Sequence, residues 1–144
     1  MKQSTINKEV KISGIGLYSG KKVNLKIRPA EIDNGITFSI KGETFPANYK
    51  NIINTNRRTI IGNDNLEIHT VEHLMSALYF RNISNANIQL DSNEPPILDG
   101  SAIEFTNLIN STGIKKQNKR ILPIIIDQKI QYDIPSKDKY ITAL

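Results

Sequence analysis

The stretch of sequence most informative about the fold is residues 70–78, Thr70-Val71-Glu72-His73-Leu74-Met75-Ser76-Ala77-Leu78. Apolar residues recur here at intervals of three and four, which is the period of one face of an α-helix. Before this stretch the chain alternates apolar and polar residues, a pattern typical of β-strands. The change of period predicts a helix with Thr70 as its N-cap. The expected buried stripe of this helix consists of Val71, Leu74, Met75, Leu78 and Tyr79.

Strands are predicted on both sides of this helix. Segments with apolar alternation occur at residues 10–12, 23–27, 36–40 and 86–90. Residues 59–61 and 66–68 flank Gly62-Asn63-Asp64-Asn65, which predicts a hairpin. Gly14 to Gly20 resembles a phosphate-binding loop only superficially, because no strand–helix pattern and no Walker lysine accompany the glycines. We interpret it as a tight connection between strands.

A second helix is expected after an irregular loop at residues 94–100. Ser101-Ala102-Ile103-Glu104 predicts a capping box, and Gly113 is suited to the position that follows a helix. Phe105, Leu108 and Ile109 would form its buried stripe. This order of elements indicates an α+β fold, in which a predominantly antiparallel sheet carries two helices packed on one face.

A domain boundary is predicted after the second helix. Lys115 to Lys119 is polar and is interpreted as a hinge, so that residues 1–118 form an N-terminal α+β domain. Residues 119–144 would then be the opening strands of a second domain. Two of those strands are expected at residues 121–126 and 129–132.

The composition limits the chemistry of any site. The chain has 144 residues and no cysteine, which excludes disulfides and thiolate zinc sites. Its histidines are His69 and His73, so a transition-metal site needs one of them, carboxylates, or ligands from outside the chain. The N-terminus lacks the apolar core of an export signal, and the longest apolar run, Ile121 to Ile126, is too short to cross a bilayer. A soluble cytoplasmic protein is therefore expected.

Basic residues give the chain a net charge of +5 and are scattered rather than clustered. They form pairs at Lys21-Lys22, Arg57-Arg58, Lys115-Lys116 and Lys119-Arg120. Solvated basic faces, a phosphate-bearing ligand and an anionic membrane surface are all compatible with this pattern. Nucleic-acid-binding motifs do not occur, so no nucleic-acid partner is expected.

Glu72 and His73 combine two groups that are useful in hydrolysis. A neutral imidazole binds zinc, and a nearby carboxylate can deprotonate a zinc-bound water. Such a pair is also common on helix surfaces, where it has no chemical role. His69 lies four residues before His73, but it precedes the expected helix, so a shared helical face is not assured. A polar residue at the end of a strand is the alternative for His69.

Further polar residues are candidates for ligand contacts. Thr55-Asn56-Arg57-Arg58-Thr59 could place guanidinium donors on a phosphate, and exposed arginines are the alternative. The candidates for contacts in a cleft are Tyr18, Thr55, Arg57 and Arg58.

Taken together, these segments resemble one enzyme family in order along the chain. The matching segments are Gly14 to Lys21, Arg28 to Ala30, Asn34 to Ile36, Thr70 to Leu78, and Glu94 to Ala102 with Phe105. They are similar to the first half of UDP-3-O-acyl-N-acetylglucosamine deacetylase, the zinc amidase of lipid A synthesis. The resemblance covers most of residues 2–118, and residues 119–144 resemble the opening strands of the family's second domain.

The resemblance implies a specific chemistry. Glu72 matches the family's general base and His73 its first zinc ligand. Zn²⁺ is the implied cofactor, and the implied substrate is a UDP-linked acylated glucosamine. Zinc-activated water would attack the acetamide carbonyl and release acetate, in the cytoplasm or at the periphery of the inner membrane.

The chain also departs from the family pattern. Tyr18 stands where the family usually has histidine near the active-site cleft. The family's second domain supplies a His-x-x-x-Asp zinc pair and a further catalytic histidine, and neither occurs in this chain. We therefore expect the N-terminal half of the enzyme, inactive alone, with the second domain required in cis or in trans. The alternative is a non-enzymatic domain that binds a nucleotide-sugar or a protein.

Overall fold

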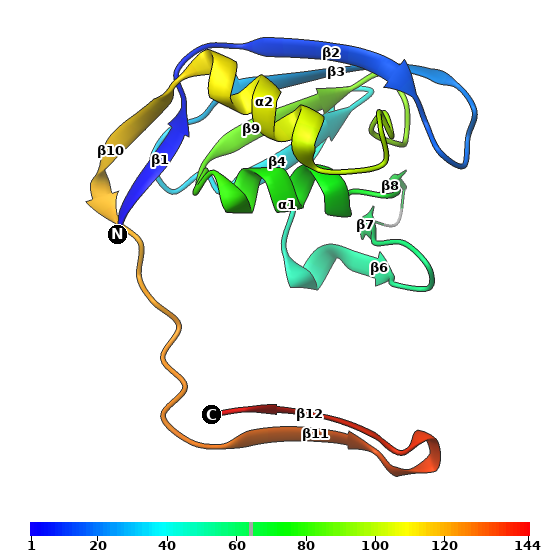
Figure 1. Ribbon diagram of the computed structural model, residues 1–144, viewed down its shortest axis with the longest axis vertical. Coiled ribbons are helices and arrows are strands. Elements are labelled where there is room, and N and C mark those ends of the chain that lie inside the picture. Colours follow the sequence, from blue (N-terminus) through cyan, green and yellow to red (C-terminus); the bar gives the residue numbers. More distant parts are fainter. Residues whose placement is uncertain (64) are drawn as a thin grey trace.

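The computed structural model describes residues 1–63 and 65–144, and its central element is a five-stranded sheet (Figure 1). Along the sheet the strands follow the order β2 (Val10–Ile15), β3 (Lys22–Pro29), β9 (Ala86–Leu90), β4 (Ile36–Ile40) and β5 (Glu43–Pro46). Neighbouring strands are antiparallel except β4 and β9, which run parallel. The sheet confirms the predicted antiparallel character, with one parallel pair added.

Three smaller sheets complete the strand structure. Strand β1 (Lys2–Ile6) pairs with β10 (Ile114–Arg120), and β11 (Ile130–Ile134) pairs with β12 (Lys139–Ala143). The third sheet joins β6 (Ile52–Asn54), β7 (Ile60–Gly62) and β8 (Glu67–Ile68). Short 3₁₀ turns span Tyr49–Asn51 and Pro135–Lys137. The predicted hairpin at residues 59–68 is the antiparallel β7–β8 pair, although its turn includes Asp64, which lies outside the described residues.

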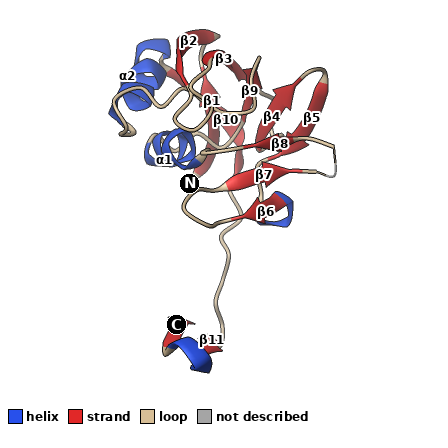
Figure 2. Cartoon of the chain, turned by 90° about the vertical axis from the view of Figure 1, so that its right-hand side faces the viewer, coloured by secondary structure: helices blue, strands red, loops and turns tan. Residues whose placement is uncertain are grey.

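Two helices, α1 (Glu72–Phe80) and α2 (Ile103–Thr112), lie on the same side of the central sheet (Figure 2). The fold is therefore α+β, as predicted. The side chains between sheet and helices are almost completely buried; they include Leu25, Ile27, Phe38, Leu74, Leu78, Ile88, Phe105 and Ile109. Each such side chain contributes about 1.5–3 kcal/mol through the apolar surface it removes from water. None of the helices in the described parts of the chain is long and apolar enough to span a membrane.

Both helices begin differently from the prediction. The N-cap of α1 is Val71, and Thr70 does not cap the helix because its hydroxyl donates to Glu94 instead. No capping box forms at α2, whose N-cap is Ala102. The Ser101 hydroxyl oxygen accepts the Ile103 N–H, while the Ser101 N–H is taken by the Asp99 carboxylate. In both cases a carboxylate outside the helix competes for the expected capping groups.

Two further predictions were wrong in detail. Tyr79 was expected in the buried stripe of α1 but is 86% exposed, because Ala77 occupies the inward position near the end of the helix. The strand expected at residues 121–126 does not form; these residues have no regular structure and are exposed. Other expectations hold, including the fully buried alternation of Val23, Leu25 and Ile27.

Residues 115–119 are part of a strand rather than a hinge. They belong to β10, which pairs antiparallel with β1 over the register Ile6 to Ile114 through Lys2 to Arg120. The pairing of two segments from opposite ends of the first 120 residues explains why a polar sequence is ordered here. The division into domains of residues 1–118 and 119–144 stays a prediction.

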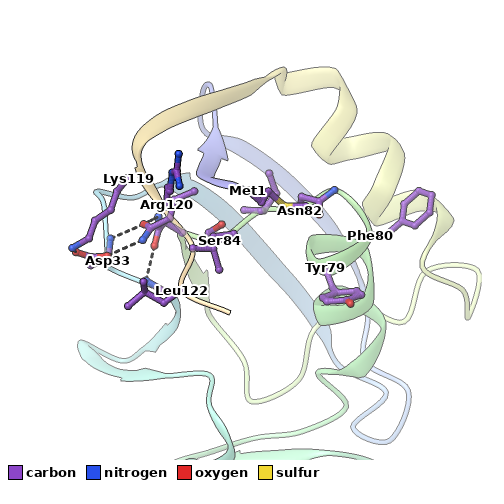
Figure 3. Close-up of a pocket in the computed structure, with 14 residues that line it drawn as sticks. Met1, Asp33, Tyr79, Phe80, Asn82, Ser84, Lys119, Arg120 and Leu122 are labelled. Atoms are coloured by element: carbon purple, nitrogen blue, oxygen red, sulfur yellow. Dashed lines mark hydrogen bonds and ion pairs between the residues drawn. The ribbon is translucent and has the colours of Figure 1, made fainter. Parts of the chain in front are cut away.

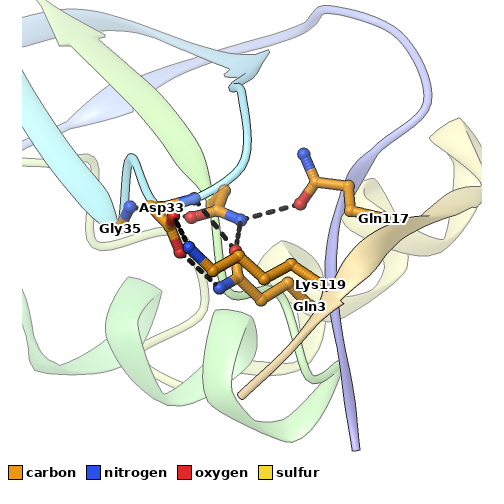
Figure 4. Close-up of polar contacts among 6 residues, drawn as sticks. Gln3, Asp33, Gly35, Gln117 and Lys119 are labelled. Carbon is orange, nitrogen blue, oxygen red and sulfur yellow. Dashed lines mark hydrogen bonds and ion pairs between the residues drawn. The ribbon is translucent and has the colours of Figure 1, made fainter. Parts of the chain in front are cut away.

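Buried amides hold β1, β10 and the start of β9 together (Figure 4). The Asn85 side-chain amide donates to Gln3 Oε1 at 2.8 Å and to Gln117 Oε1 at 2.7 Å. Its oxygen accepts the Gly35 N–H at 2.7 Å. Because the donors and the acceptor of the Asn85 amide are all satisfied, the network specifies how the small β1–β10 sheet joins the central sheet.

Candidate functional site

Glu72 is the first residue of α1, and its carboxylate is held in place by the segment that enters β7. Oxygen Oε2 of Glu72 accepts the backbone N–H of Thr59 at 3.1 Å. The neighbouring Val71 N–H donates to the Thr59 carbonyl at 3.5 Å. A carboxylate in the first helical turn is also favoured by the helix dipole. Glu72 is half-buried, so it is partly accessible to solvent.

His73 lies next along α1 and is half-buried. Asp99 lies in the loop before α2. Hydrogen bonds from the Ser101 N–H and hydroxyl hold the pKa of the Asp99 carboxyl below its ordinary range.

His69 takes no part in this arrangement. It lies between β8 and α1, outside the helix, so the four-residue spacing to His73 does not produce a shared helical face. Its Nε2 is 3.1 Å from Glu67 Oε2. This contact supports the interpretation of His69 as a polar residue at a strand end.

Glu94 is a functional candidate that sequence reasoning missed. It is only 2% exposed although it lies in an irregular loop. Its carboxylate accepts the Tyr18 N–H at 3.1 Å, the Ser19 N–H at 3.0 Å and the Thr70 hydroxyl at 3.0 Å. Burial raises the pKa of Glu94, but the hydrogen bonds from Ser19, Tyr18 and Thr70 outweigh it and hold the pKa below its usual range. Glu94 is thus a buried anion that ties the β2–β3 loop to the start of α1.

Local backbone geometry adapts to this buried carboxylate. Thr70 has φ 55°, a left-handed conformation that is unfavourable for a β-branched residue. A Cβ on Gly16 would lie 2.5 Å from Glu94 Oε2, so any larger residue there would displace the carboxylate. The glycine-rich β2–β3 loop is therefore shaped to receive a protein carboxylate.

Tyr18 and Arg58 meet although they are far apart in the sequence. The Arg58 guanidinium carbon lies 4.1 Å from the centroid of the Tyr18 ring. Thr55 and Arg57 are exposed on the segment that leads from β6 to β7, and Arg57 has φ 63°. Of the four predicted cleft residues, the structure brings only Tyr18 and Arg58 into mutual contact among the contacts of the described chain.

These contacts form a connected set of residues around the start of α1, which we call the helix-start frame. Glu94 accepts the Tyr18 N–H, and the Tyr18 ring contacts the Arg58 guanidinium. Thr59, the neighbour of Arg58, donates its N–H to Glu72. The Thr70 hydroxyl donates to Glu94. The residues of the frame are Tyr18, Arg58, Thr59, Thr70, Glu72 and Glu94. Its members come from separate segments of the chain, which explains why no local motif predicts it.

A cavity of about 820 Å³ lies elsewhere, beside the end of α1 that is distant from Glu72 (Figure 3). Tyr79, Phe80 and Leu122 are among its lining residues, and neither Glu72 nor His73 belongs to them. The described residues also contain no group of three or more His, Cys, Asp or Glu side chains placed to hold a metal ion. His73 is accordingly a single candidate ligand.

The fold and the site together define an α+β domain that carries a carboxylate and an imidazole, Glu72 and His73, in the first turn of α1. Comparison of the sequence with protein families extends this description: the chain belongs to the UDP-3-O-acyl N-acetylglycosamine deacetylase (LpxC) family, whose model matches residues 3–144.

Curated relatives agree with this assignment. The chain is 41% identical over 133 residues to the UDP-3-O-acyl-N-acetylglucosamine deacetylase of Thermodesulfovibrio yellowstonii, covering 91% of this chain and 46% of the relative. It is 38% identical over 143 residues to the deacetylase of the same name from Campylobacter fetus, covering 98% of this chain and 48% of the relative. The chain thus spans about half the length of the curated relatives it matches.

Proposed function

We propose that this chain supplies the general base and one zinc ligand of a UDP-3-O-acyl-N-acetylglucosamine deacetylase of lipid A biosynthesis. The observation that carries the proposal is the Thr59 N–H bond to Glu72, which orients the carboxylate beside His73 at the start of α1. The membership of the chain in the deacetylase family supports the same reaction. The site would act in the cytoplasm or at the periphery of the inner membrane.

Glu72 has the properties that a general base requires. One oxygen is occupied by the Thr59 N–H, which prevents the side chain from rotating away from the site. The other oxygen takes a proton from the attacking water and returns it to the nitrogen that leaves. Hydrolysis of the acetamide then yields acetate and a free amine. Positioned acid–base catalysis of this kind contributes about 10²–10⁴-fold in rate.

His73 does not complete a metal site by itself. Catalytic zinc usually has three protein ligands and one open position, and the described residues offer no such cluster. His73 would be one ligand of the metal. The remaining ligands would come from a second domain, in cis or in trans, and we derive no step of the reaction through the metal from this chain alone.

Reconstitution tests the proposal. The 144-residue chain would be mixed with the C-terminal half of the Campylobacter fetus relative, and zinc content and acetate release from the UDP-linked acylated glucosamine would be measured. We expect activity from the mixture and none from the chain alone. Glu72→Gln should remove activity while leaving zinc bound, His73→Ala should lower zinc content, and His69→Ala should alter neither. Acetate release by the chain alone, or full activity with Glu72→Gln, would contradict the proposal.

The second candidate is a non-enzymatic domain that binds a nucleotide-sugar. It is favoured by the single imidazole, since a lone ligand does not hold catalytic zinc. The reconstitution distinguishes the two functions: a mixture that binds the nucleotide-sugar but takes up no zinc and releases no acetate would support the binding domain.

A further inference from the structure

The stacked pair Tyr18 and Arg58 has properties that the general-base proposal does not use. A guanidinium stacked on an aromatic ring keeps its N–H donors in its own plane, where they remain available at the edge. The distance of 4.1 Å to the ring centroid is within the range of cation–π attraction. The contact with the ring therefore restrains the Arg58 guanidinium without occupying its N–H donors.

Arg58 has no acidic partner among the residues that the structure describes. The salt bridges among the described residues join Lys11 and Arg28 to Glu9, and Lys119 to Asp33. The remaining acidic contact of a basic side chain is that of His69 with Glu67. Arg58 is nevertheless half-buried, whereas the adjacent Arg57 is exposed. A partly buried, oriented cation without a protein anion is suited to binding an anion from outside.

Contacts on both sides hold Arg58 in its position. The backbone of Tyr18 is held by the buried Glu94 carboxylate, which fixes the point from which the ring projects toward Arg58. Arg58 directly precedes Thr59, whose N–H holds Glu72. The helix-start frame thus connects the Arg58 guanidinium to Glu72, the candidate general base.

We propose that Arg58, oriented by Tyr18, binds a phosphate group of a nucleoside diphosphate next to Glu72. The planar guanidinium matches two phosphate oxygens with two parallel N–H bonds. The choice of a nucleoside diphosphate rests on the proposed function, because the relatives are named for a UDP-linked substrate. Arg58 would then determine the specificity for a phosphate-bearing ligand, and Tyr18 would position Arg58.

Binding of inorganic pyrophosphate, UDP and uridine to the 144-residue chain tests this assignment. Calorimetry gives Kd, and the NMR signal of the Arg58 side-chain N–H reports direct contact. Pyrophosphate and UDP should bind, and uridine should not. Arg58→Ala should raise Kd about tenfold or more, because the phosphate would lose its charge-assisted hydrogen bonds. Arg58→Lys, which keeps the charge but loses the planar fork, should raise Kd severalfold.

Two matched pairs of variants separate this site from general surface charge. Tyr18→Leu should weaken binding severalfold while Tyr18→Phe, which keeps the ring, should not. Arg57→Ala removes an exposed charge of the same kind and should change Kd less than twofold. Equal losses from Arg57→Ala and Arg58→Ala would overturn the proposal, as would binding of uridine alone or no binding of pyrophosphate and UDP. Acetate release and zinc content are measured separately, so failure of the phosphate site is distinguishable from failure of the general-base proposal.

Discussion

The Thr70 hydroxyl donates to Glu94 Oε1 at 3.0 Å, which joins the loop after β9 to a residue two positions before α1. The same carboxylate accepts two N–H groups of the β2–β3 loop, so one buried anion joins that loop to the residue two positions before Glu72. A site built on such a connection depends on a residue that carries no chemistry itself. The contribution of Glu94 to the stability of this region can be measured directly.

Replacing Glu94 with glutamine should lower the free energy of unfolding by about 2 kcal/mol. A glutamine has one acceptor oxygen, and its amide N–H groups would face donors that the carboxylate now satisfies. Urea denaturation of the wild-type chain and Glu94→Gln measures the difference. Glu104→Gln is the matched control, because Glu104 is exposed on α2 and its change should stay within about 0.5 kcal/mol. Equal stability of the two variants would show that Glu94 is not a structural anion.

Acid should remove the contribution of Glu94 to stability. The folded-state pKa of Glu94 lies below its ordinary range, so the unfolded chain binds this proton more readily. The stabilisation is therefore complete above the unfolded pKa of about 4.3 and is lost as the pH falls below it. Thermal unfolding of the wild-type chain and Glu94→Gln between neutral pH and about pH 3 tests this, and the gap in Tm should narrow on acidification. A gap independent of pH would refute it.

Gly16→Ala should destabilise the chain by about 1–3 kcal/mol through overpacking. The added Cβ would meet the Ser19 hydroxyl and the Glu94 carboxylate, which hold the loop together. Gly20→Ala provides the comparison, because Gly20 has φ 61° and no atom within 4 Å of a Cβ. It should cost about 1–2 kcal/mol from the left-handed conformation alone. Only Gly16→Ala should also perturb the amide NMR signals of Tyr18 and Ser19, and unchanged signals would argue against the close approach.

Asn85→Asp should lower the free energy of unfolding by about 3 kcal/mol at neutral pH. The substitution turns both amide donors into acceptors that face Gln3 Oε1 and Gln117 Oε1, and it places a charge where the native residue is 1% exposed. Part of the loss should be recovered near pH ~4, when the carboxyl is protonated and can donate. Asn82→Asp, at an exposed position, should change stability by no more than about 0.5 kcal/mol. Denaturation curves at both pH values decide the outcome, and a loss that does not depend on pH would contradict the role of the amide donors.

Local patterns were sufficient for much of the fold. The alternation at Val23, Leu25 and Ile27 and the helical period after residue 70 depend on which face is apolar, a property of neighbouring residues. The deacetylase family is likewise indicated by short motifs, because their order along the chain is specific even where each motif is weak. Helix starts were less predictable, because the hydroxyls of Thr70 and Ser101 can bond either a helix end or a carboxylate outside the helix.

The chain sequence alone was enough to determine the α+β class, the position of Glu72 and His73 on a helix, and the family. Only the tertiary structure decided that Glu94 is buried and ionised, that Tyr18 meets Arg58, and that the polar β10 is a strand. Each of these features depends on partners that are distant in the sequence. The free energy of a buried carboxylate or of a strand is set by the hydrogen-bond partners that folding brings to it. The periodic pattern of neighbouring residues contains no information about those partners.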